Sequence, residues 1–343
     1  MSRVDVIVPC YNYGDLIEQC VRSVLSQEGV DVRVLIMDDA STDATQSVGR
    51  RLAADPRVEY RRHEVNRGHI ATYNEALALL TGEYCVILSA DDLLTPGSLM
   101  RATRLMNAHL NVGLTFGHDI TFRLAPPIGA ARQARCCGHR ILGYGEFLQR
   151  SCRLGHTAIQ SPTAVVRTTL HRQIGGYLPE LPHSGDTEIW LRMAAHSDVC
   201  ELDADQAFRR LHASNMSLGY SAVRRLEEQK KAFDVHFNAY RHVRPEIACL
   251  EPMLNQTIAE SAFWSGARAF EDGRVSTCDE FLAFASATWP GIGSWDPWRR
   301  FRWKRRVGRA GFWLLEQVAA RVRHSLPARF RDEATDRAGV AFK

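Results

Sequence analysis

A buried strand that ends in two carboxylates is the feature that most limits how this chain can fold. The apolar run Tyr84 to Leu88 is typical of a strand inside a sheet, and Asp91 and Asp92 come shortly after it. Thr95-Pro96 then starts the next helix. Carboxylates at the end of a buried strand are costly unless their charge is compensated. Oxygen ligands of this kind favour a hard divalent cation and, behind it, a ligand that carries phosphate.

Three similar strands precede this one. Apolar runs predict strands at Val4 to Pro9, Val32 to Met37 and Val58 to Arg62, and the segments between them predict helices from about Asp15, from Asp43 to Ala54 and from Ile70 to Leu80. Asp15 and Glu18 have the spacing of a capping box at the first helix. Strands that alternate with helices form a parallel sheet covered on both faces. Ligands of such sheets bind beyond the carboxyl ends of the strands.

A second acidic pair, Asp38-Asp39, ends the second strand at that same edge. An Asx-turn or the cap of the next helix would explain these residues without any ligand. Asp43 already suits the N-cap of the next helix, so a cap does not explain why Asp38 and Asp39 are also present. Two acidic pairs on one edge therefore favour a binding site over local structure alone.

The second half of the chain has a weaker pattern. Gly, Pro and Arg are frequent from Arg123 to Gly145, which indicates a surface loop or variable insert. We expect a strand from Gln160 to Thr168 and a helix from Glu188 to His196. From about Ala222 the chain is predicted to be helical, with an antiparallel helical pair at Ala259 to Phe270 and Thr277 to Ala287.

Composition limits the class of protein. No stretch is long and apolar enough for a membrane span, and the chain starts without the pattern of a signal peptide. The nine cysteines form no CxxC pair, so we expect a reduced, cytoplasmic protein without structural zinc. A formal net charge of +4 is too small to indicate nucleic acid as a partner. No GxGxxG follows the first strand, which disfavours an oxidoreductase.

Four motifs in order carry a resemblance to glycosyltransferase family 2. They are Val6-Ile7-Val8-Pro9-Cys10-Tyr11-Asn12, Asp38-Asp39-Ala40-Ser41-Thr42-Asp43, Asn66-Arg67-Gly68 with Asn74, and Ser89-Ala90-Asp91-Asp92. The resemblance covers roughly the first two-thirds of the chain. It implies an α/β GT-A (Rossmann-like) fold with a mainly parallel sheet flanked by helices, a UDP- or dTDP-sugar donor, Mn²⁺ or Mg²⁺, and inversion at the anomeric carbon.

The resemblance also implies roles for single residues. Asp92 resembles the direct metal ligand, and Asp91 the residue that contacts the ribose or the donor sugar. Asp39 resembles the acceptor of a hydrogen bond from a uracil or thymine imide, and Tyr11 the residue beside the base. The remaining donor-binding positions implied by the motifs are Pro9, Asn12, Asn66, Arg67 and Gly68.

Two later segments extend the resemblance. The segment from Arg210 to Ser217 is similar to the one in which a histidine closes over the diphosphate, which makes His212 a second metal ligand. The segment from Ser184 to Arg192 is similar to the acidic motif on the acceptor side. Asp186 is the expected general base there, with Glu188 as the competing choice because the usual Glu-Asp pair is missing. A helix N-cap would explain Asp186 without catalysis.

We expect residues 1–220 to form the catalytic domain, with a nucleotide-binding half at 1–110 and an acceptor half at 111–220. Residues 221–343 are expected to be a helical region that ends in a basic, aromatic tail starting near Trp295. Such a tail suits contact with the inner face of an anionic membrane, and a lipid-linked acceptor would fit it. A solvated basic face with packed aromatics is the alternative, and a homodimer through the helical region is also left open.

The function expected from these features is non-processive sugar transfer to a hydroxyl-bearing acceptor, in glycan, glycolipid or glycosylated-metabolite biosynthesis. Two alternatives remain at this stage. A nucleotidyltransferase would need a Gly-rich, Lys-bearing loop after the first strand, which Pro9 to Gly14 does not provide. A non-catalytic module that only binds nucleotide sugars would not need Asp186 and His212.

Overall fold

The structure is a computed structural model that describes residues 1–127, 138–212 and 222–308. The chain divides into two compact units, Met1–Thr257 and Ile258–Lys343. The predicted catalytic domain of residues 1–220 therefore lies in the first unit, while its boundary at residue 220 stays a prediction.

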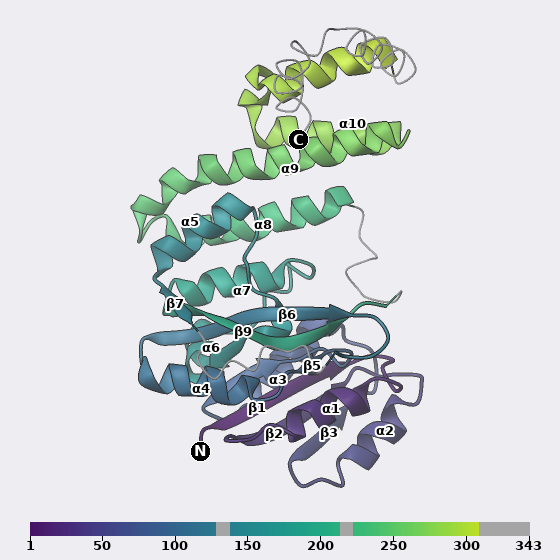
Figure 1. The fold of residues 1–343 in the computed structure, drawn as a ribbon, viewed down its shortest axis with the longest axis vertical. Coiled ribbons are helices and arrows are strands. Elements are labelled where there is room, and N and C mark those ends of the chain that lie inside the picture. Colours follow the sequence, from purple (N-terminus) through teal and green to yellow (C-terminus); the bar gives the residue numbers. More distant parts are fainter. Residues whose placement is uncertain (128–137, 213–221, 309–343) are drawn as a thin grey trace, which may run out of the picture. The chain divides into compact units, whose positions relative to one another are not determined.

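The first unit contains a sheet of nine strands among the described residues (Figure 1). The strands are β1 (Arg3–Cys10), β2 (Asp31–Asp38), β3 (Val58–Arg62), β4 (Tyr84–Ile87), β5 (Leu93–Leu94), β6 (Val112–Phe122), β7 (His139–Leu142), β8 (Val165–Arg167) and β9 (Asp198–Arg210). Their order is β3-β2-β1-β4-β8-β6-β9-β5, and β7 pairs with β9.

The half formed by β1 to β4 is parallel, as predicted. Helices α1 (Ile17–Leu25), α2 (Thr45–Leu52) and α4 (Ser98–Ala108) cover one face, where Val6 and Val8 share a buried cluster with Ile17 and Val21. Helix α3 (His69–Ala78) packs against β1 and β2 through the other face. Burial on both faces explains why these strands are almost continuously apolar. The predicted α/β class, with a mainly parallel sheet flanked by helices, is confirmed.

The other half of the sheet contains parallel and antiparallel strands, and the sequence pattern predicts few of them. Strands β6 and β9 are parallel to each other, whereas β5, β7 and β8 pair in antiparallel fashion. A Cβ on Gly113 would lie 2.4 Å from Ser197 Oγ, and one on Gly117 would lie 2.6 Å from the carbonyl oxygen of Ala204. Close approach of β9 therefore requires glycine in β6, and glycine weakens the strand pattern of the sequence.

Three expectations about local structure need correction. The predicted loop from Arg123 to Gly145 includes β7 and the start of α5 (Tyr144–Leu154), while its residues 128–137 lie outside the described part of the chain. The strand expected at Gln160 to Thr168 is a 3₁₀ turn, η2 (Ser161–Thr163), followed by the short β8. Pro162 lies within that turn, and proline has no N–H to contribute to a strand ladder.

The capping box proposed at Asp15 is also wrong. Helix α1 begins at Ile17, and its N-cap residue Leu16 makes no side-chain cap. Glu18 instead pairs with Arg22 and Arg51. Asp43 does act at the start of α2, because its carboxylate accepts hydrogen bonds from the N–H groups of Thr45 and Gly14 at 2.9 Å each.

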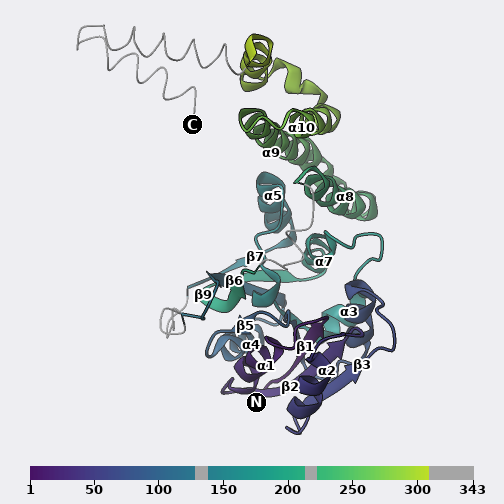
Figure 2. The same ribbon diagram turned by 90° about the vertical axis from the view of Figure 1, so that its right-hand side faces the viewer.

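The remaining helices of the first unit are α6 (Thr168–Ile174), α7 (Gly185–Ala194), α8 (Ala222–Tyr240) and the short η4 (Pro245–Leu250). Helix α9 (Glu251–Glu271) begins there and continues into the second unit, which also contains α10 (Val275–Thr288), η5 (Pro290–Ser294) and a helix at 296–308 (Figure 2). The two predicted helices of the pair are thus confirmed. Gly273, with a φ of 81°, ends α9 in the left-handed conformation that glycine favours. No helix of the described residues is long and apolar enough to cross a membrane.

The fold makes a prediction about acid stability. His236 of α8 is fully buried, its Nε2 lies 2.9 Å from the Tyr144 hydroxyl, and burial lowers its pKa to about 3. The folded protein keeps this imidazole neutral, whereas the unfolded chain binds a proton below pH of about 6.5, so stability is lost as pH falls. The unfolding free energy of the wild type should fall by about 2 kcal/mol between pH 8 and pH 5 because of His236. In His236→Gln this contribution to the fall should be absent. Urea denaturation at both pH values measures this, and exposed His242→Gln is the control. An unchanged pH dependence in His236→Gln would contradict it.

Candidate active site

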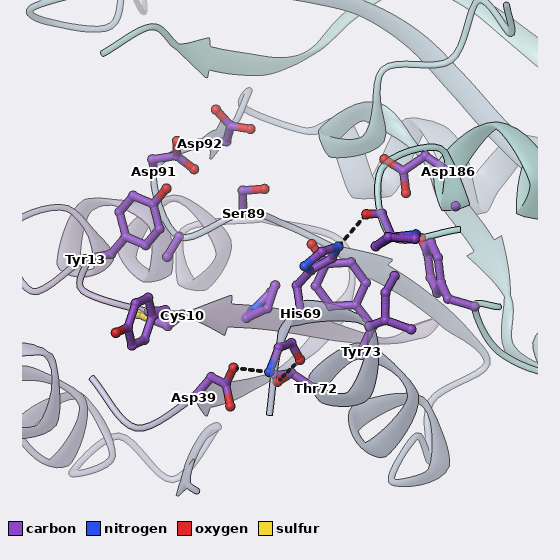
Figure 3. A pocket seen from close by; sticks show the side chains of 18 of the residues that line it. Cys10, Tyr13, Asp39, His69, Thr72, Tyr73, Ser89, Asp91, Asp92 and Asp186 are labelled. Carbon is purple, nitrogen blue, oxygen red and sulfur yellow. Dashed lines mark hydrogen bonds between the residues drawn. The ribbon is translucent and has the colours of Figure 1, made fainter. Parts of the chain in front are cut away.

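A cavity of about 630 Å³ opens at the carboxyl edge of β1, β2 and β4. Figure 3 shows Asp39, Asp91, Asp92 and Asp186 around it. Eight of the predicted site residues line the cavity: Pro9, Tyr11, Asp39, Asn66, Gly68, Asp91, Asp92 and Asp186. The other four, Asn12, Arg67, Glu188 and His212, are not part of its lining.

Asp39 is buried and fixed by backbone donors. Its Oδ1 accepts hydrogen bonds from the N–H of Arg67 at 2.8 Å and lies 2.7 Å from His63 Nδ1, while its Oδ2 accepts from the N–H of Gly68 at 2.8 Å. A carboxylate oxygen can accept two hydrogen bonds. Among the described residues, the N–H of Gly68 is the one donor to Oδ2, so this oxygen can accept one more hydrogen bond from a ligand in the cavity.

The turn Asn66-Arg67-Gly68 supplies two of these donors. Gly68 has a φ of 82°, which a residue with a Cβ would adopt only under strain. The Arg67 side chain pairs with Glu75 at 2.5 Å, so this arginine contributes through its backbone. Asn12 also has a structural contact: its Oδ1 accepts the N–H of Thr42 at 2.8 Å.

Asp38 has a different role from its neighbour. Its carboxylate accepts hydrogen bonds from the Tyr60 hydroxyl at 2.5 Å and from the N–H of Ser41 at 2.8 Å. Ala40, which follows the pair, has a φ of 63° and lies in the left-handed region. Of this acidic pair, only Asp39 reaches the cavity.

Asp91 and Asp92 are held by the end of β9. Asp92 Oδ1 accepts the N–H of Arg210 at 2.9 Å, and Asp91 Oδ2 lies 2.8 Å from His212 Nε2. The Arg210 guanidinium donates to the Asp91 carbonyl oxygen and to Gln19. The structure thus brings His212 to the acidic pair, as expected, but beside Asp91 rather than Asp92.

The acidic pair carries an electrostatic cost. Burial, and after it the charge of Asp91, raise the pKa of Asp92 to about 7. Among the described residues, no three His, Cys, Asp or Glu side chains form a complete metal site. One or two carboxylates together with substrate phosphates are, however, the usual ligands of Mg²⁺. The donors present therefore fit a divalent cation that arrives with a phosphate-bearing ligand.

The two candidate bases are clearly distinguished by position. Asp186 lies in the first turn of α7, lines the cavity and accepts a hydrogen bond from the Ser161 hydroxyl. Glu188 is 3% exposed and pairs with Arg192 at 2.7 Å, away from the cavity. Burial raises the pKa of Glu188. Its contacts are those of a structural ion pair.

Several lining residues were not predicted. Tyr13, His69, Tyr73, Tyr177, His183 and Arg209 all contribute to the cavity. Tyr13 packs edge-on to His212 with ring centroids 5.9 Å apart, and it lies in the same loop as Tyr11, which was the only signal for it in the sequence. Arg209 brings a guanidinium that Asp119 holds at 2.7 Å.

Helix α3 joins the two sides of the cavity. Asn74 accepts the N–H of Tyr177 at 2.7 Å and donates to the Tyr177 carbonyl oxygen at 2.8 Å. A Cβ on Gly176 would lie 2.2 Å from the Asn74 Oδ1, so glycine is required beside this clamp. His69 Nε2 donates to the Pro182 carbonyl oxygen at 2.6 Å (Figure 3). The loop that leads to Asp186 is therefore fixed to the helix whose N-cap residue, Gly68, binds Asp39.

Comparisons with known proteins identify the family of this chain. Residues 5–175 match the family model described as Glycosyl transferase family 2. The GalNAc(5)-diNAcBac-PP-undecaprenol beta-1,3-glucosyltransferase of Campylobacter jejuni is 31% identical over 120 residues, which are 34% of this chain and 38% of that protein. The matched segments of the first curated relatives cover between 28% and 71% of their lengths.

Two solved structures share the fold. TarS of S. aureus in complex with UDP-GlcNAc has a TM-score of 0.54 at 17% identity, covering 83% of this chain and 91% of that one. The mannosyltransferase PcManGT from Pyrobaculum calidifontis, in complex with GDP-Man and Mn²⁺, has a TM-score of 0.50 at 19% identity, covering 98% and 84%. The chain belongs to glycosyltransferase family 2 and is a sugar transferase.

Proposed function

We propose that the protein is an inverting, metal-dependent, non-processive glycosyltransferase that moves a sugar from a UDP- or dTDP-sugar to an acceptor hydroxyl. One observation carries the proposal. A single cavity is lined by Asp39, by the Asp91-Asp92 pair and by Asp186, which come from three distant parts of the chain.

The nucleobase end of the donor is assigned to Asp39. The remaining acceptor position of its Oδ2 suits the imide N–H of uracil or thymine, and half-exposed Tyr11 lies in the same wall of the cavity. The similar structures were solved with UDP-GlcNAc and with GDP-Man, so the shared fold is compatible with more than one base. The choice of a uracil or thymine donor rests on Asp39 alone.

The cation is assigned to the acidic pair and His212. Asp92 and His212 are the proposed ligands, and Asp91 joins them because it lies 2.8 Å from His212. Mn²⁺ or Mg²⁺ bound there would neutralise the charge that develops on the departing diphosphate. The similar mannosyltransferase was solved with Mn²⁺. Arg209, in the same lining, adds positive charge from the protein itself.

The transfer step is assigned to Asp186. The acceptor oxygen bonds to the anomeric carbon as the bond from that carbon to the diphosphate oxygen breaks, and Asp186 takes the hydroxyl proton. Ser161 donates to Asp186 Oδ2, which fixes the carboxylate. A base and a leaving group on opposite sides of the sugar are consistent with one displacement and inversion.

The acceptor is proposed to be a hydroxyl of a glycan, glycolipid or glycosylated metabolite, with a lipid-linked sugar as the leading choice. The name of the Campylobacter relative describes transfer to an undecaprenol-linked glycan. A peripheral place on the inner face of a membrane would suit such an acceptor, and a homodimer through the helical region remains part of the proposal.

The donor assignment is tested by thermal unfolding with a panel of nucleotide sugars, with and without Mn²⁺. A UDP- or dTDP-sugar should stabilise the protein by about 2.7 kcal/mol at 100 times its Kd, and only when Mn²⁺ is present. Asp91→Asn should lose this stabilisation, whereas Asp203→Asn, an exposed carboxylate of β9, should keep it. Equal stabilisation without the cation would contradict the metal assignment, and a preference for GDP-sugars would contradict the role of Asp39.

The base assignment is tested by Asp186→Asn. The rate of donor hydrolysis, with water as the acceptor, should fall about 10²- to 10⁴-fold because proton transfer is lost. Affinity for the nucleoside diphosphate, measured by calorimetry, should stay close to that of wild type. The matched variant Glu188→Gln should lower thermal stability and leave hydrolysis much less affected. If Glu188→Gln lost activity and Asp186→Asn kept it, the roles would be reversed.

A further inference from the structure

The second unit presents one helix with a concentrated positive charge. The helix at 296–308 contains six cationic side chains and one acid. The cations are Arg299, Arg300, Arg302, Lys304, Arg305 and Arg306, and the acid is Asp296. A cation on the packed side of this helix can stabilise the fold, whereas a cation on the exposed side is available to a binding partner.

One side of this helix packs against the rest of the second unit. The ring of Phe301 lies 5.5 Å from those of Phe263 and Phe270, and the ring of Trp298 lies 5.9 Å from that of Phe263. On the same side, Lys304 pairs with Glu271 at 2.8 Å and Arg305 pairs with Asp279 at 2.6 Å. These aromatics and these two cations therefore have structural partners.

The opposite side is basic and exposed. Arg299, Arg302, Trp303 and Arg306 follow the spacing i, i+3, i+4, i+7, which places them on one side of a helix, and Arg300 is exposed beside them. We call these five residues the arginine face. Trp303 is 54% exposed, although large aromatic side chains are usually buried. The Arg299–Asp296 pair, at 3.7 Å between two side chains about 70% exposed, neutralises little.

We propose that the arginine face is a docking surface for an anionic phospholipid bilayer. Four arginines match a surface of lipid phosphates, and each contributes a factor of about 5 in affinity near an anionic membrane. Trp303 lies among them, and tryptophan favours the boundary between lipid headgroups and acyl chains. The arginines complement the negative charge of the lipid headgroups, and Trp303 suits the boundary between headgroups and acyl chains.

This surface is distinct from the active site and belongs to the second unit alone. Its chemistry also differs from that of a nucleic-acid site. The arginine face contains a single aromatic ring, that of Trp303, whereas a single-strand site presents several rings on which successive bases stack. The arrangement favours lipid over nucleic acid as the occupant.

The test is co-sedimentation of the full chain with vesicles of phosphatidylcholine, with and without phosphatidylglycerol. Wild type should bind only the anionic vesicles, and added salt should weaken binding. Arg302→Gln combined with Arg306→Gln should weaken it about 25-fold. The matched control, Arg268→Gln with Arg274→Gln, removes the same charge from exposed positions of α9 and the following turn, and should bind as wild type. Thermal unfolding verifies that each variant is folded.

A second measurement tests the place of Trp303. Vesicles with brominated acyl chains should quench tryptophan fluorescence of the wild type, and Trp303→Phe should remove most of that quenching. The proposal is overturned if the Arg302/Arg306 variant binds anionic vesicles as wild type does, if the control pair loses as much affinity, or if a short DNA duplex is bound more tightly than the vesicles. No nucleotide sugar is needed, so the outcome does not depend on the proposed transfer reaction.

Discussion

The contact between the end of β4 and the end of β9 is the interaction on which the site depends. Asp91 and Asp92 are 6% and 5% exposed, so their charges need partners. The partners come from the second half of the chain: the N–H of Arg210 binds Asp92, and His212 binds Asp91. These contacts compensate the pair only in part, because burial and the charge of Asp91 still raise the pKa of Asp92 to about 7. The remaining deficit is what makes this point of the fold suitable for a cation.

Helix α3 extends that dependence to the rest of the cavity. Its N-terminal Gly68 binds Asp39, and its Asn74 clamps the backbone of Tyr177, which precedes Asp186 by nine residues. Asp39, the proposed nucleobase-binding residue, and Asp186, the proposed catalytic base, are thus attached to one helix. The Asn74 amide binds backbone atoms of Tyr177, and the Asp39 carboxylate binds the N–H of Gly68, so the helix sets the spacing between the two sites. The in-line displacement proposed for this site requires such fixed positioning.

The sequence predicted the first half of the fold well and the second half poorly, for a physical reason. Strands β1, β2 and β4 are buried on both faces, so their apolar runs are visible without any knowledge of the fold. Strands β6 and β9 pair across a long separation and include glycines and polar residues that only their mutual contact explains. The motifs identified eight lining residues, whereas Tyr177 and Arg209 reach the cavity through tertiary contacts that no local pattern encodes. Glu188 competes with Asp186 for the role of base in the sequence, whereas in the structure Asp186 lines the cavity and Glu188 is buried against Arg192.

In the basic tail, too, the sequence does not show which residues are packed and which are exposed. Sequence grouped Trp298, Phe301 and Trp303 with the arginines around them, but packing divides the group into a structural side and an exposed side. The net charge of +4 gives no sign of this division. Because salt screens exposed charges beyond about 8 Å, a partner responds to the local density of arginines and not to the total. The position of each charge on the helix, not its number, therefore determines what this unit can bind.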